Sequence, residues 1–365
     1  MRDKLAAVTA SRTPFALLLL LGSGCTVSLD EEHLEDLGAP AVSVRELCVQ
    51  TPPAGVTQGT ALSLELPEGS AFVFGETIVE EGSRLTFLPN TQALASDPEQ
   101  PCGFAYVRDS DGDLQVPIAL TEEEVALDAS RADGRRTALW PSGGFAAGDT
   151  GYVFYQKVTL EGYLDVARVG TGVARVRAGE TAERLSVQRY AEEPLLTWVA
   201  PDSDWGTGSL LGTDGMAYVY GCYERAAFDV GCRLARVQPE YVAEPDAYRY
   251  YDVDGAWSDR IERAAWVFTG ASNLSGFYSE ALGRYVLLYS EYLGNRVYAV
   301  TAPEPFGPFG EAIELTTGLA PREFWIGRVD VHPGLGSANG RRFVFGYHTD
   351  SPAAPGLHLV ETVLR

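Results

Sequence analysis

Aromatic rings and carboxylates next to glycine or proline are the side chains in this sequence that are best suited to chemistry. Trp140 precedes Pro141 and Trp205 precedes Gly206, so both indole rings are expected in loops. The apolar face of a sugar stacks on such rings while its hydroxyls take hydrogen bonds from polar neighbours. His332 follows Asp330 by two residues, which places both side chains on one face of a strand. These residue types suit a carbohydrate site.

Signatures of other catalytic machineries do not occur in the sequence. It contains no Gly-x-Ser-x-Gly elbow, no His-Glu-x-x-His helix and no phosphate-binding P-loop. Residues 109–113 read Asp-Ser-Asp-Gly-Asp, but the glycine stands at the fourth position and the twelfth is not glutamate. This segment is therefore predicted to be a hairpin turn with solvated aspartates and not an EF-hand.

The cysteines indicate structural disulfides. Setting Cys25 aside leaves Cys48, Cys102, Cys222 and Cys232, none at metal-site spacing. Four cysteines allow three pairings. The sequence predicts a single hairpin loop between Cys222 and Cys232, so a disulfide between these two is favoured. Cys48 is then left to pair with Cys102.

Composition places the chain among ordinary globular proteins. Of 365 residues, 45% are hydrophobic, and the net charge is −22 with a pI near 4.5. Disorder and a polytopic membrane protein are excluded on these grounds. Nucleic acid is not an expected partner, because so acidic a chain repels phosphate backbones.

The N-terminus is typical of an export signal. A cationic start and a short apolar run are followed by Gly22-Ser23-Gly24-Cys25, which resembles a bacterial lipobox. We expect residues 1–24 to be a signal peptide, Cys25 to be lipidated and residues 25–41 to be an acidic tether. Plain secretion with cleavage nearby is the alternative. If Cys25 is lipidated, we expect a protein of the bacterial cell envelope that contacts the membrane through its N-terminal lipid only.

A repeated phrase is the strongest indication of the fold. Five times, a glycine-bearing turn precedes an aromatic-rich strand, at intervals of 58 to 80 residues; these strands begin at Phe72, Tyr152, Tyr218, Tyr285 and Phe343. A short apolar segment precedes each turn, and a further strand follows each phrase, residues 84–87 in the first unit. Such two-sided sheets cover their apolar faces when they pack radially.

We therefore predict an all-β, five-bladed β-propeller over residues 42–365, with those five aromatic rings packed between blades. The fifth unit ends at Arg365, right after its third strand. A strand from residues 41–49 is expected to add to the last blade and close the ring. Helix signals are scarce, and residues 121–125 are expected to start a single turn.

Short phrases also resemble a known family. Residues 72–77, Phe-Val-Phe-Gly-Glu-Thr, are similar to a phrase of the secreted bacterial propellers grouped as domain-of-unknown-function family 4185. Residues 302–309 and 331–335 resemble phrases of the arabinanase-like and fructosidase-like glycosidases. The resemblance implies a five-bladed fold whose axial funnel, in enzymatic relatives, cleaves glycosidic bonds with carboxylates.

The relatives carry carboxylates where an innermost strand begins and where a second strand ends. When these positions are carried over to this sequence one by one, the resemblance implies four candidate catalytic residues: Glu76, Asp204, Glu291 and Asp330. The first innermost strand begins with Gln58-Gly59-Thr60 and lacks the usual aspartate. The candidate sugar-binding residues are Trp140, Trp205, Trp325, Arg328, His332, Tyr347 and His348.

Two functions from different classes follow. The first is an envelope-anchored propeller that binds a glycan and hydrolyses it with a pair of carboxylates. The second is a binding or scaffold lipoprotein with a degenerate, glycosidase-like propeller. The chain is expected to be a monomer without a cofactor, and the relatives' axial histidine leaves a central calcium ion as an alternative.

Overall fold

The computed structural model describes residues 42–95, 97, 100–161, 165–187, 189–316, 326, 328–349 and 356–364. The chain divides into residues 1–37 and 38–365, and every described residue belongs to the second unit. The predicted signal peptide (residues 1–24), Cys25, the tether (residues 25–41) and Trp325 lie outside the described residues. No helix in the described part is both long and apolar enough to cross a bilayer.

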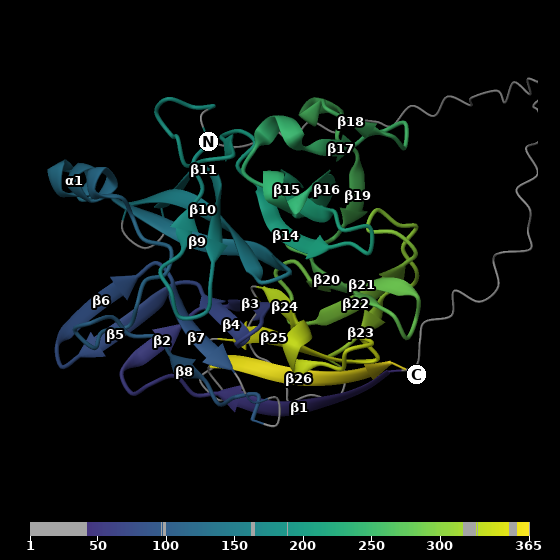
Figure 1. Ribbon diagram of the computed structural model, residues 1–365, viewed down its shortest axis with the longest axis horizontal. Helices are drawn as coiled ribbons and strands as arrows, with labels where there is room; N and C mark the ends of the chain where they lie inside the picture. The colour runs from purple at the N-terminus through teal and green to yellow at the C-terminus, as the bar shows by residue number, and fades with distance from the viewer. Residues whose placement is uncertain are drawn as a thin grey trace, which may run out of the picture. The chain divides into compact units, whose positions relative to one another are not determined.

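Five antiparallel sheets form the blades (Figure 1). Blade 1 contains β3 (Ala61–Leu66), β4 (Gly69–Phe74), β7 (Thr91–Ala95) and β8 (Ala105–Tyr106). Blade 2 contains β9 (Arg136–Ala147), β10 (Thr150–Glu161), β11 (Asp165–Val176), β12 (Glu183–Arg184) and β13 (Trp198–Val199). Blade 3 contains β14 (Trp205–Leu211), β15 (Ala217–Ala226), β16 (Asp229–Val237), β17 (Arg249–Tyr251), β18 (Trp257–Ser258) and β19 (Trp266–Thr269). Blade 4 contains β20 (Ser275–Ser279), β21 (Arg284–Ser290), β22 (Val297–Ala302) and β23 (Ile313–Glu314). Blade 5 contains β24 (Val329–His332), β25 (Arg342–Thr349), β26 (Gly356–Leu364) and β1 (Val42–Gln50).

The first strand of each blade faces a common axis. β3 lies against β9, β9 against β14, β14 against β20, β20 against β24, and β24 returns to β3. This closed order defines a five-bladed β-propeller and confirms the predicted fold class. The five aromatic-rich phrases form the second strands: β4, β10, β15, β21 and β25.

Apolar clusters fill the space between neighbouring blades. Phe72 of blade 1, for example, belongs to a cluster that includes Val344 and Leu359 of blade 5. Each of the other four junctions has a corresponding cluster. All five rings of the repeated phrase are buried, as predicted: Phe72, Tyr152, Tyr218, Tyr285 and Phe343. Burial of such rings between sheets is the main stabilising contribution available to radially packed blades.

The N-terminal strand closes the ring, as the sequence predicts. β1 runs antiparallel to β26 from Val42↔Leu364 to Gln50↔Leu357, with one register shift between Glu46 and Cys48. Both strands lie side by side in Figure 1. The Cys48–Cys102 disulfide ties this strand to the loop before β8 of blade 1, and Cys222–Cys232 joins β15 to β16. Both predicted disulfides are confirmed.

A small additional sheet corrects one prediction. Residues 84–87, expected as the third strand of blade 1, belong instead to β6 (Arg84–Leu88) in a separate sheet with β5 (Thr77–Glu81) and β2 (Val56–Gln58). The third strand of blade 1 is β7, which pairs with β4. Alternation of apolar residues does not distinguish a strand of the ring from one in a hairpin inserted into it. We call β2–β5–β6 the inserted sheet.

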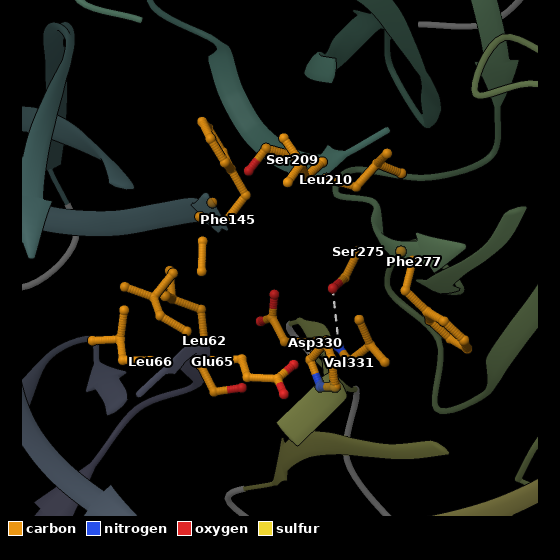
Figure 2. Close-up of a pocket in the computed structure, with 18 of the residues that line it drawn as sticks. Leu62, Glu65, Leu66, Phe145, Ser209, Leu210, Ser275, Phe277, Asp330 and Val331 are labelled. Carbon is orange, nitrogen blue, oxygen red and sulfur yellow. Dashed lines mark hydrogen bonds between the residues drawn. The ribbon is translucent and has the colours of Figure 1, made fainter. Parts of the chain in front are cut away.

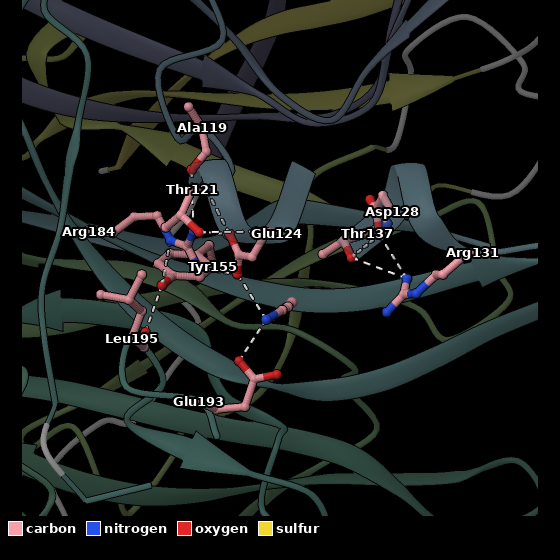
Figure 3. Close-up of polar contacts among 11 residues, drawn as sticks. Ala119, Thr121, Glu124, Asp128, Arg131, Thr137, Tyr155, Arg184, Glu193 and Leu195 are labelled. Atoms are coloured by element: carbon pink, nitrogen blue, oxygen red, sulfur yellow. Dashed lines mark hydrogen bonds and ion pairs between the residues drawn. The ribbon is translucent and has the colours of Figure 1, made fainter. Parts of the chain in front are cut away.

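The described residues contain one α-helix, α1 (Glu122–Ser130), which ion pairs attach to blade 2 (Figure 3). Thr121 caps its first turn, and Glu124 closes a capping box with Thr121. Glu124 also accepts from Lys157 at 2.8 Å and from Arg184 at 3.1 Å. These three side chains are at most 12% exposed. The helix has no buried residue of its own, so this polar cluster holds it in place.

Short 3₁₀ turns occupy loops: η2 (Pro239–Tyr241), η3 (Pro245–Ala247), η4 (Ile261–Arg263) and η5 (Pro333–Leu335).

The Glu124 cluster makes stability depend on pH. Burial alone would raise the pKa of Glu124, but hydrogen bonds from Arg184 and Lys157 outweigh it and lower the pKa from 4.5 to about 2. Because the folded-state pKa is depressed, the stabilisation is present above pH 4.5 and is lost as the pH falls towards 2. Glu124→Gln is expected to cost about 2 kcal/mol at pH 7 and to lose less stability than the wild type between pH 5 and pH 3. Denaturant unfolding at both pH values measures this. The exposed neighbour Glu123→Gln is the control, and equal pH dependence in wild type and Glu124→Gln would contradict the assignment.

Candidate active site

The starts of the five innermost strands surround a cavity of about 660 Å³, which we call the mouth cavity. Its wall is formed by residues from all five blades: Gly59, Thr60, Gly75, Glu76, Trp140, Pro141, Ser142, Gln156, Arg168, Asp204, Thr207, Cys222, Tyr223, Glu224, Val230, Ser272, Asn273, Tyr292 and Arg328. Two predicted carboxylates, Glu76 and Asp204, therefore share one cavity with Trp140. They come from blades 1, 3 and 2, respectively.

The opposite ends of the same strands surround a second cavity of about 500 Å³, the lower axial cavity (Figure 2). The carboxylate of Asp330 points into it. Arg328 lines both cavities and lies between them. Its guanidinium donates to Asp330 Oδ1 at 2.7 Å and also to the carbonyl oxygen of Ser142 in blade 2. The Arg328–Asp330 pair therefore bridges blades 5 and 2 and forms the floor of the mouth cavity.

Glu76 stands just after β4, at the end of the second strand of blade 1. Its side chain is accessible to solvent through the cavity, and no ion pair joins it to another described residue. Desolvation by the surrounding walls raises the pKa of Glu76 above 4.5, and the positive charge of Arg136 partly opposes this. A carboxyl group with a raised pKa keeps its proton at higher pH, which is what a general acid requires.

Asp204 precedes β14 in blade 3 and is 16% exposed. Burial raises its pKa, and the nearby guanidinium of Arg168 partly opposes that rise. Arg168 forms an ion pair with Asp204 across the cavity wall. An arginine contact of this kind favours the ionised carboxylate. Asp204 thus differs from Glu76, which has only the more distant charge of Arg136.

The two predicted tryptophan platforms have different environments. Trp140 lies within β9 and not in a loop, and it lines the mouth cavity. Trp205 begins β14 and is fully buried between blades 2 and 3, where it stacks with Trp198 at 6.0 Å between ring centroids. Trp205 therefore has no face open to a sugar. Its burial corrects the expectation of a loop ring, because glycine after a tryptophan also allows close packing: Gly206 (φ 84°) approaches Phe154.

The remaining predicted residues lie outside the mouth cavity. Glu291 is in the loop after β21, where Arg296 is 3.6 Å away. His332 is buried between blades 5 and 1, and its Nδ1 forms a 2.8 Å hydrogen bond with Ser63 Oγ. Burial lowers the pKa of His332 to about 3, so the ring is neutral. Tyr347 is buried and stacks on His358.

His348 lines a neighbouring cavity that also includes Glu76. Among the described residues, no group of three or more metal-ligating side chains occurs.

Several cavity residues escaped the sequence analysis. Arg168 lies on β11, a third strand, whereas the resemblance pointed only to first and second strands. Asn273 donates to the carbonyl oxygen of Val329, and its buried Oδ1 has no partner among the described residues.

The fold and the mouth cavity define a β-propeller with carboxylates from different blades at one end of its axis. The family model described as "Domain of unknown function (DUF4185)" matches residues 58–328, and the chain belongs to this family. The resemblance noted in the sequence is thereby confirmed.

Solved structures with a similar fold include glycoside hydrolases. Zg3597, a family 117 glycoside hydrolase of Zobellia galactanivorans, is 10% identical, with 89% of this chain and 90% of that chain covered and a TM-score of 0.46. The GH43_1 enzyme of Xanthomonas citri complexed with xylotriose is 13% identical, with coverages of 87% and 90% and a TM-score of 0.47. The endo-arabinase of Bacteroides thetaiotaomicron VPI-5482 is 12% identical, with coverages of 87% and 98% and a TM-score of 0.47. No curated protein matches the chain.

The burial of Trp205 gives a prediction that separates packing from binding. Trp205→Ala is expected to lower the free energy of unfolding by about 3–5 kcal/mol, because it leaves a cavity between two blades. Trp140→Ala should cost less, since that ring is only partly buried. Urea unfolding of both variants measures the difference. A Trp205→Ala variant as stable as the wild type would show that the ring is not a packing element.

Proposed function

We propose that this protein binds a glycan in the mouth cavity and hydrolyses a glycosidic bond there. The observation that carries the proposal is the shared cavity of Glu76, Asp204 and Trp140. Glycoside hydrolysis needs one carboxylic acid to protonate the leaving oxygen and one carboxylate as base or nucleophile. An aromatic ring beside them offers a surface for the apolar face of a sugar.

The environments of the two carboxylates support a division of roles. Burial raises the pKa of both carboxyl groups, but only Asp204 has an arginine partner that favours its ionised form. Glu76, which has no ion pair among the described residues, is therefore assigned as the general acid. Asp204, which pairs with Arg168, is assigned as the carboxylate that acts as base or nucleophile. Arg328 and Asp330 are positioning residues, because they hold Ser142, two residues from Trp140, across the axis.

A second candidate function is glycan binding without cleavage. Arg168 bonded to Asp204 weakens that carboxylate as a base, and the first innermost strand is preceded by Gln58-Gly59-Thr60 without an aspartate. Both observations favour a cavity that has kept its binding surface and lost its chemistry.

Anchoring in the bacterial cell envelope is a further part of the proposal. Its support is the lipobox-like sequence Gly22-Ser23-Gly24-Cys25 after a short apolar run. A lipid on Cys25, followed by an acidic tether, would hold the propeller at a membrane surface.

Substitution of Glu76 tests the catalytic role. In a screen against arabinans, fructans and envelope polysaccharides, Glu76→Gln is expected to lower kcat by about 100-fold or more, with little change in KM. Wild-type activity should fall as the pH rises through the raised pKa of Glu76, because the acid must be protonated.

The matched control is Glu68→Gln, an exposed carboxylate in the turn at the opposite end of the same hairpin. Full activity in Glu76→Gln, or an equal loss in Glu68→Gln, would refute the assignment. Sugar binding with no hydrolysis by the wild type would favour the second candidate.

Lipidation is tested in a bacterial host. The wild type should incorporate radiolabelled palmitate and remain with the membrane fraction, whereas Cys25→Ala should do neither. Mass spectrometry of the mature N-terminus checks the site. An unmodified wild-type chain that begins at another residue would support plain secretion.

A further inference from the structure

A third cavity adjoins the mouth cavity beneath the inserted sheet. This side cavity, of about 340 Å³, is lined by Thr57, Gln58, Gly59, Thr60, Glu76, Ile78, Phe87, Arg136, Trp140, Leu160 and His348. Four of these residues also line the mouth cavity: Gly59, Thr60, Glu76 and Trp140. A ligand in the mouth cavity can therefore extend past Glu76 into the side cavity without leaving the surface.

Arg136 is the distinctive group of the side cavity. It begins β9, and its guanidinium carbon lies 4.0 Å from the centre of the Phe87 ring on β6. At this distance the guanidinium makes a cation–π contact with the ring, a contact that does not use its N–H groups as hydrogen-bond donors. The inserted sheet thus holds this cation over the cavity.

The other arginines that line these cavities are already neutralised. Arg168 pairs with Asp204, and Arg328 pairs with Asp330. Within the described part of the chain, Arg136 forms no ion pair and no side-chain hydrogen bond. Its guanidinium lies over the Phe87 ring, and its positive charge partly opposes the raised pKa of Glu76. In a protein with a net charge of −22, an unpaired arginine inside a cavity marks a place where an anion is attracted.

We propose that the side cavity binds a negatively charged substituent of the glycan, a carboxylate or a sulfate ester, on the sugar next to the one in the mouth cavity. The proposal rests on the proposed function, and it narrows the substrate class to acidic glycans. Arginine binds both oxyanions through paired N–H donors. Ile78 and Leu160 supply apolar walls for the C–H face of the same sugar.

Glu76 is the carboxyl group that shares this cavity with Arg136. As the general acid it is protonated before the reaction, and in that form it does not repel a bound anion. The reaction and the recognition of an anion are therefore compatible at neighbouring positions.

Binding of three matched sugars to the full-length mature protein tests the proposal. The probes are D-glucose, D-glucuronate and D-glucose 6-sulfate, titrated by ligand-observed NMR at low salt. The wild type is expected to bind at least one charged probe about tenfold more tightly than glucose. The two charged probes show whether a carboxylate or a sulfate is preferred.

Arg136→Gln is expected to remove this preference, leaving glucose and the charged probes with equal affinity. Arg136→Lys should retain part of it, because the charge remains while the paired donors are lost. The control is Arg135→Gln: Arg135 is the adjacent residue, paired with Glu161 at 2.8 Å and absent from the cavity wall. It should behave as the wild type.

Unchanged glucose binding in Arg136→Gln shows that the variant is folded. A preference that survives Arg136→Gln, or a wild type that binds charged and neutral sugars equally, would overturn the acidic-glycan proposal and leave the proposed function standing. If none of the three sugars binds and no polysaccharide is cleaved, the proposed function fails as well.

Discussion

Closure of the ring by β1 is the constraint on which the rest of the structure depends. A blade is a small sheet with two apolar faces, and each face must be covered by a neighbour. The ring closes only if the strand before blade 1 pairs with the last strand of blade 5. The β1–β26 ladder provides this meeting, and the Cys48–Cys102 disulfide connects the closing strand to blade 1. Phe72 and Val344 are then buried together at the junction of blades 1 and 5.

The site is a consequence of that closure. Five innermost strands start at the same end of the axis, so residues far apart in sequence, such as Glu76 and Asp204, line one cavity. Arg328 strengthens the arrangement by reaching from blade 5 to the backbone of blade 2, with Asp330 holding its guanidinium. The inserted sheet adds a wall that the ring itself does not supply.

Much of the fold could be predicted from the sequence because the same physical requirement recurs in every blade. Buried second strands need aromatic rings, and tight turns before them need glycine, so the phrase around Phe72 reappears four times. The candidate site was less predictable. Trp140 and Trp205 have similar sequence neighbours, yet one lines a cavity and the other is buried, because blade packing decides exposure. The contact between Arg136 and Phe87 joins β9 of blade 2 to β6 of the inserted sheet. Because the two residues are far apart in the sequence, no local pattern predicts their contact.

Native-state hydrogen exchange of the closing strand tests the account most directly. Mass spectrometry of peptides covering β1 (Val42–Gln50) and β26 (Gly356–Leu364) measures whether their ladder amides open only with the rest of the propeller. The account predicts that both exchange as slowly as the buried second strand β25 (Arg342–Thr349). Rapid exchange of the β1 amides, with β25 still protected, would show that the ring is not closed by this strand and would contradict the shared cavity built on it.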